Sequence, residues 1–97
     1  MSLGGKGVIS VLSNVAPKET HEMTRLCLEG DFKSAAALQL KYLDLINALF
    51  CEVNPIPAKT AMAEMGFCDV EMRLPLCEME EATKARLLTS LKKHGLI

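Results

Sequence analysis

The chain has 97 residues, 49% of them hydrophobic, and its 11 basic and 12 acidic side chains leave a net charge of −1. This length supports one small domain with one core, and a disordered chain would be poorer in apolar residues. Acids and bases are interspersed and no stripe of lysine or arginine occurs, so a nucleic-acid surface is not expected. No run of 18 apolar residues exists, so a membrane span is not expected either.

The first predicted element is a short strand. Residues 1–3 carry no pattern and are expected to be a leader. Residues 8–12 (VISVL) follow a glycine-rich entry (GGKG, residues 4–7) and are rich in β-branched residues, which predicts one buried strand. No second convincing strand appears, and the edges of a lone strand carry unpaired backbone groups. We therefore expect the partners of this strand to lie outside the chain.

A helix is predicted next, over residues 18–29. Pro17 suits its first position, and Gly30 suits the position just beyond its end. Met23, Leu26 and Cys27 have the i, i+3, i+4 spacing of an apolar helix face.

Three further helices are predicted in the rest of the chain. Asp31 is a good N-cap for a long central helix over residues 32–50, which the prolines of residues 54–57 (NPIP) terminate. A third helix is expected over residues 58–65, an extended connector over 67–77, and a last helix from about residue 78 to 94. The expected fold class is mostly α, with one orphan strand and about four helices.

The cysteines and histidines do not form a metal-binding pattern. Cys27, Cys51, Cys68 and Cys77 are separated by 24, 17 and 9 positions, whereas zinc sites use close ligand pairs. The default interpretation is buried, reduced thiols in a cytoplasmic protein, with no metal and no cofactor. His21 and His94 are expected to be solvated on helix surfaces.

Few residues could carry out a reaction. Lys59 follows a proline-rich turn, but a Schiff-base lysine needs a desolvated pocket, so a structural role is favoured. Residues 4–7 lack the spacing and the trailing Lys-Ser/Thr of a phosphate-binding loop. The sequence alone therefore offers no catalytic constellation.

Two stretches resemble a known family. Residues 4–17 (GGKGVISVLSNVAP) and 52–59 (EVNPIPAK), the latter followed by MRLPL at 72–76, are similar to the end of dihydrodipicolinate synthases, which belong to the class I pyruvate aldolase superfamily that includes N-acetylneuraminate lyase. The resemblance covers residues 4–97, and NPIPxK is its most specific motif. It implies a (β/α)8 TIM barrel with an added helical domain. Residues 4–30 would be the last barrel β/α unit, and 31–97 the C-terminal helical domain.

The resemblance also implies a function. The family are lyases of lysine and diaminopimelate biosynthesis that condense pyruvate with aspartate semialdehyde through a Schiff base. The family's Schiff-base lysine, tyrosine relay and arginine align before residue 1, so no catalytic residue is expected in this chain, and alone it should be inactive. The resemblance assigns only backbone positions of the family's substrate pocket to this chain. These are the Ile9 carbonyl at the mouth of the barrel, with Ser10 and Val11 beside it.

Other interpretations remain open. Four amphipathic helices could form a stand-alone interaction or oligomerisation module. An intact small enzyme is the third alternative, for which no constellation is found. Uncovered apolar helix faces predict a homo-oligomer, or strand swapping through residues 7–12. Cys77 stands where the family commonly has a Thr/Ser-rich cap, which predicts a loosely begun last helix.

Overall fold

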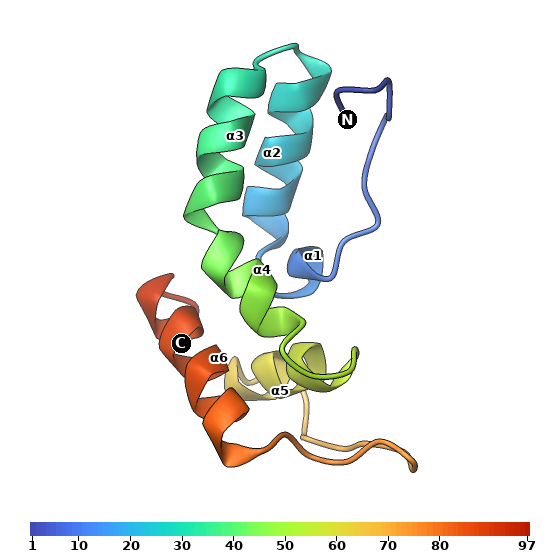
Figure 1. Cartoon of the computed structure of the whole chain (residues 1–97), viewed down its shortest axis with the longest axis vertical. Coiled ribbons are helices and arrows are strands. Elements are labelled where there is room, and N and C mark those ends of the chain that lie inside the picture. Colours follow the sequence, from blue (N-terminus) through green and yellow to red (C-terminus); the bar gives the residue numbers. More distant parts are fainter.

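The computed structural model describes residues 1–97 and contains helices but no strand. It is elongated, with extents of 41 × 26 × 21 Å. In Figure 1, α2 and α3 form a hairpin at one end, α5 and α6 lie at the other end, and α4 connects the two. The elements are α1 (Leu12–Val15), α2 (Pro17–Leu28), α3 (Phe32–Lys41), α4 (Leu43–Leu49), α5 (Ile56–Glu64) and α6 (Glu81–Lys93).

The mostly helical fold class is confirmed, but the strand expected at residues 8–12 does not form. Val8 and Ile9 are exposed in an extended segment beside α2, and Leu12 begins the short helix α1 (Figure 1). The physical reason is that strand pairing needs a second strand, and this chain has none. The four-residue α1 carries no strong sequence signal, and it buries Leu12 and Val15 in the core.

The α2–α3 hairpin agrees with the local signals that predict it. Pro17 occupies the first turn of α2, and Gly30 has φ 85°, the left-handed conformation that glycine adopts without steric cost. The Asp31 carboxylate accepts a hydrogen bond from the Ser34 N–H (3.0 Å), which caps α3. Hydrogen bonding from Ser34 lowers the pKa of Asp31.

The single helix expected over residues 32–50 is divided at Tyr42. The Tyr42 N–H donates to the Leu38 carbonyl (3.1 Å) and closes α3, while its own carbonyl accepts from the Ile46 N–H (2.9 Å) and opens α4. Neither proline nor glycine lies at this point. Tyr42 is buried, and its ring stacks on His94. Tertiary packing, which the apolar periodicity does not report, accompanies the change of direction.

The core lies where α4, α5 and α6 meet. Leu45, Leu49, Ala61, Leu87 and Leu91 are fully buried there. The two later helices lie close to their predicted positions, and the expected connector over residues 67–77 is irregular. The helices fall short of the length and hydrophobicity that a membrane-spanning helix requires.

The start of α6 is capped by a residue distant in sequence. The Glu52 carboxylate accepts hydrogen bonds from the Glu80 N–H (3.0 Å) and from the Thr83 hydroxyl. These bonds satisfy a donor in the first turn, where Cys77 and Glu80 provide no side-chain cap. The helix expected from about residue 78 therefore begins at Glu81, with a cap from the segment after α4.

Candidate functional site

The three residues predicted to line a substrate pocket stay together in the extended segment before α1. Ile9 is fully exposed, whereas Ser10 and Val11 are partly buried. The Ser10 carbonyl accepts from the Ser13 hydroxyl (2.5 Å), and the Val11 carbonyl accepts from the Asn14 N–H (3.1 Å). The Ile9 carbonyl has no hydrogen-bond partner in the chain and is free to face another group.

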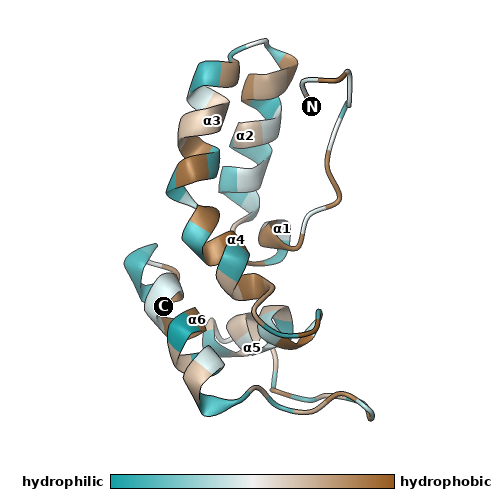
Figure 2. Cartoon of the chain, viewed as in Figure 1, coloured by the Kyte–Doolittle hydropathy of each residue, from teal (hydrophilic) through white to brown (hydrophobic).

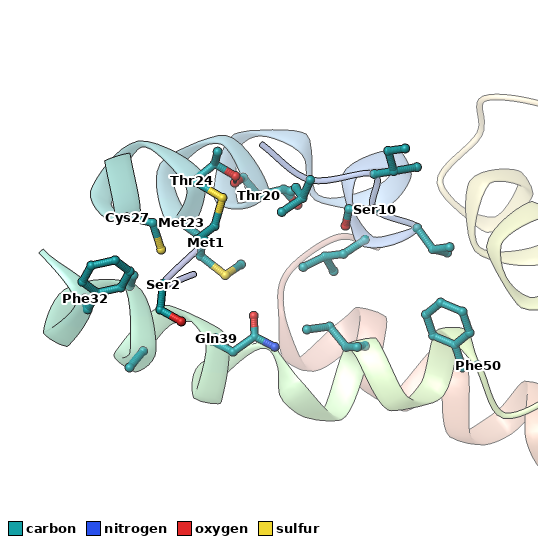
Figure 3. Close-up of a pocket in the computed structure, with 17 residues that line it drawn as sticks. Met1, Ser2, Ser10, Thr20, Met23, Thr24, Cys27, Phe32, Gln39 and Phe50 are labelled. Carbon is teal, nitrogen blue, oxygen red and sulfur yellow. The ribbon is translucent and has the colours of Figure 1, made fainter. Parts of the chain in front are cut away.

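This segment forms one wall of an open groove of about 650 Å³. The other walls come from α2 and from the α3–α4 arm, and Figure 3 shows Met23, Cys27, Phe32 and Phe50 around the opening. Twelve of the 17 lining residues are hydrophobic. Figure 2 likewise shows strongly hydrophobic positions along the extended segment and on α3 and α4. The groove is therefore suited to cover by apolar side chains.

The polar groups of the groove offer little chemistry. The Thr20 hydroxyl donates to the Ala16 carbonyl (2.9 Å), and the Thr24 hydroxyl donates to the Thr20 carbonyl (2.9 Å). Both donors are thus used within their own helix. Ser10 and Gln39 are the other polar side chains labelled along the opening in Figure 3, apart from Ser2 near the N-terminus. No lysine, histidine or carboxylate side chain lines the groove, so the Cys27 thiol is the one titratable side chain there.

A second polar cluster joins α4 to the end of α6. Asp44 accepts from His94 Nε2 (2.8 Å), Lys93 Nζ (3.0 Å) and the Ser90 hydroxyl (3.2 Å). The His94 ring also stacks on Tyr42, with 4.6 Å between ring centroids and 25° between planes. Burial alone would raise the pKa of Asp44, but the hydrogen bonds and charges of His94 and Lys93 outweigh it and hold that pKa well below its usual range.

This cluster corrects the expectation that His94 is solvated. The His94 side chain is only 3% exposed, because Tyr42 and Asp44 enclose it. Although Ser90, Asp44 and His94 lie together, Asp44 stands between the hydroxyl and the imidazole, and no Ser90–His94 hydrogen bond is present. The arrangement fastens two helices and lacks the nucleophile–base contact of a hydrolytic triad.

The remaining candidates have simple surroundings. The Lys59 ammonium donates to the Glu71 carbonyl (2.5 Å) and fixes the connector against α5, in agreement with a structural role. His21 lies exposed on α2. No group of three or more His, Cys, Asp or Glu side chains lies together in a way that could hold a metal ion. All four cysteines are free, but the expectation that they are buried is wrong, because Cys27 and Cys51 are only partly buried and Cys68 and Cys77 are exposed.

The sequence does not predict the long-range contacts of Glu52 and Asp44, or the burial of the His94 side chain. Glu52 and Thr83 are 31 residues apart, and Asp44 and His94 are 50 apart. No local spacing links such pairs. The proline-rich stretch after Glu52, which turns the chain back toward α6, is the one signal that could have suggested a long-range contact.

Comparison with known proteins places this arrangement in context. The model of the Dihydrodipicolinate synthetase family matches residues 1–94. The chain is 57% identical over 97 residues to a 4-hydroxy-tetrahydrodipicolinate synthase of Lachnoclostridium phytofermentans and 53% identical to one of Clostridium tetani, and it covers 33% of each. The solved dihydrodipicolinate synthase from Aquifex aeolicus is 48% identical with a TM-score of 0.96, over 98% of this chain and 32% of that one. The chain thus spans about a third of the length of the curated relatives it matches.

Proposed function

The chain belongs to the dihydrodipicolinate synthetase family and corresponds to its C-terminal part, and from this premise we propose that it completes a lyase that condenses pyruvate with aspartate semialdehyde through a Schiff base. The observation that carries the proposal is identity of 57% along the whole chain to a 4-hydroxy-tetrahydrodipicolinate synthase. In this proposal residues 4–30 are the last β/α unit of the barrel and residues 31–97 are the added helical domain. The product would feed lysine and diaminopimelate synthesis.

To such a site this chain would contribute backbone groups and part of the pocket wall. The free Ile9 carbonyl would face the reacting group at the mouth of the barrel, with Ser10 and Val11 beside it. The nucleophilic lysine and the proton relay would come from the part of the enzyme that this chain does not cover. Support comes from the groove, whose lining holds no lysine, histidine or carboxylate side chain.

We propose that the chain alone is inactive and acts in the cytoplasm. Lys59 is committed to the Glu71 carbonyl and does not lie in the groove, so it is poorly placed to attack a ketone. Four cysteines without a disulfide suit a reducing compartment.

A chimera tests the proposed function. This chain replaces the corresponding third of the Clostridium tetani relative, and the product is assayed with pyruvate and aspartate semialdehyde. We expect an active enzyme that forms a borohydride-trapped pyruvate adduct on a lysine outside these 97 residues. A well-folded chimera without turnover would contradict the proposal, as would an adduct on Lys59.

A second function, a homo-oligomerising module, is favoured by exposed apolar side chains. Val8, Leu28, Leu40, Phe50 and Phe67 are each at least half exposed. Apolar surface of this kind drives association in water. We propose that the isolated chain self-associates through its helix faces or through residues 7–12. Light scattering at several concentrations tests this, and a monomer at all of them would contradict it.

A further inference from the structure

The residue that ends α6, His94, contacts the junction of α3 and α4. Its ring stacks on Tyr42, with 4.6 Å between the ring centroids, and its Nε2 lies 2.8 Å from a carboxylate oxygen of Asp44. The Asp44 carboxylate is ionised at neutral pH and can only accept a hydrogen bond, so Nε2 carries the hydrogen and donates it. The imidazole therefore contacts both the residue before α4 and a residue in the first turn of α4.

Among the partners of Asp44, His94 is the one that is buried. Its side chain is only 3% exposed, whereas the Lys93 side chain is 64% exposed, and an ion pair so open to solvent contributes little. The Ser90 hydroxyl lies farther from the carboxylate, at 3.2 Å. The buried hydrogen bond and the ring stacking of His94 are therefore the main restraint on the start of α4.

The core connects the start of α4 to α1. Leu45 and Leu49 of α4 are fully buried, and they belong to the same hydrophobic cluster as Leu12 and Val15 of α1. In Figure 1, α1 lies beside α4 near the middle of the molecule. Close-packed interiors contain few voids, so a displaced helix displaces the side chains packed on it. A shift at the start of α4 should therefore reach α1.

α1 in turn holds the segment that carries Ile9. The Ser13 hydroxyl donates to the Ser10 carbonyl (2.5 Å). The backbone N–H and the side-chain amide of Asn14 both donate to the Val11 carbonyl (3.1 and 3.2 Å). The Ile9 carbonyl itself makes no hydrogen bond within the chain. Its direction is therefore set by the two residues that follow it, and both are fastened to α1.

We propose that His94 is a positioning residue for the lyase reaction: it fixes the start of α4 and, through α1, the direction of the Ile9 carbonyl. The inference rests on the proposed function. His94 does not line the groove, so it would act without touching the substrate. A misdirected carbonyl should disturb the geometry of the reacting group more than it disturbs substrate binding. The loss should therefore appear in kcat and spare KM.

The chimera described above, carrying His94→Ala, tests this role. We expect kcat to fall about fivefold or more, while KM for pyruvate changes less than about twofold. Glu52→Ala is the matched control, because it also loosens α6 but makes no contact with Tyr42 or Asp44. It should change kcat less than about twofold. Equal losses of kcat in the two variants would overturn the assignment, since general loosening of α6 would then explain both.

A conservative variant tests the hydrogen bond itself. The side-chain amide of His94→Gln can still donate to Asp44, although it cannot stack as a ring does. It should recover part of the kcat that His94→Ala loses. A kcat in His94→Gln as low as in His94→Ala would contradict the part of the proposal that rests on this bond.

Amide exchange tests the restraint without activity. The N–H groups of Asn14 and Ala16 donate to the carbonyls of Val11 (3.1 Å) and Leu12 (2.8 Å) and report on α1. In the folded chimera their exchange should be at least about threefold faster with His94→Ala and unchanged with Glu52→Ala. An active chimera in which His94→Ala changes neither exchange nor kcat would reject the positioning role and leave the proposed function standing. A folded but inactive chimera with faster exchange would reject the proposed function and support the restraint alone.

Discussion

The two halves of the chain are built in different ways. In residues 1–41, every hydrogen bond that involves a side chain joins residues no more than four positions apart. In residues 42–97, side chains bridge elements up to 50 positions apart. The fully buried leucines lie in α4 and α6, whereas α2 buries only Thr20 and Met23. The core lies mostly in the second half, with α1 packed against it, whereas the face between the extended segment and the α2–α3 hairpin is an open groove.

Helical order and tertiary closure are therefore separate properties in this chain. The α2–α3 hairpin is well capped, yet its groove face remains open to solvent. Caps and short-range ion pairs act within a turn or two of the helix that carries them. Closure needs apolar surface from elsewhere, which α5 and α6 provide for α1 and α4 but not for the α2–α3 hairpin.

The largest expected effect comes from the closed core. Leu91→Ala removes a fully buried side chain and should lower the free energy of unfolding by about 3 kcal/mol. The matched change Leu28→Ala, at a residue 54% exposed on α2, should cost less than about 1 kcal/mol. Urea unfolding measures both. Similar losses of stability would contradict this difference, because they would mean that the two leucines contribute equally to the folded state.

A smaller effect should follow loss of the distant cap. Glu52→Ala removes the acceptor of the Glu80 N–H and of the Thr83 hydroxyl, and should cost about 1–2 kcal/mol. Amide exchange of residues 81–84 should accelerate, while exchange in α2 stays unchanged. Glu52→Gln retains an acceptor oxygen and should cost less than the alanine variant. Equal acceleration in α2 and α6 would contradict an effect local to the start of α6.

The smallest effect concerns the Asp44 cluster and depends on pH. Since the Asp44 side chain is 38% exposed, solvent weakens its ion pairs, and Asp44→Asn should cost about 1 kcal/mol at neutral pH. The pKa of Asp44 is lowered in the folded chain, so its stabilisation is complete above the unfolded-state value of about 3.9 and is lost as pH falls below it. The difference in free energy of unfolding between the wild type and Asp44→Asn should therefore be smaller at pH 3 than at pH 7. A gap of constant size would contradict this linkage.

Local signals account for what the sequence predicts well. Pro17, Gly30 and Asp31 each act on the backbone within one turn, and the ends of α2 and the start of α3 follow them. The family resemblance was also accessible, because the motif at residues 54–59 lies in one continuous stretch.

Contacts between distant segments account for what the sequence does not predict. The apolar pattern continues through Tyr42, so periodicity cannot show that the helix is divided there. The β-branched run at residues 8–12 reports a preference for extended backbone, which becomes a strand only beside a partner. The role of Ile9, Ser10 and Val11 stays a prediction, since it depends on groups outside the chain.

The change of direction between α3 and α4 at Tyr42 coincides with a contact to a residue distant in the sequence. No breaker residue sets the angle there; the ring of Tyr42 is held by His94, next to the carboxyl end of the chain. Through this stacking contact, residues near the carboxyl end of the chain orient the hairpin that carries the groove. Tyr42→Ala should alter the relative orientation of the two halves more than the secondary structure of either.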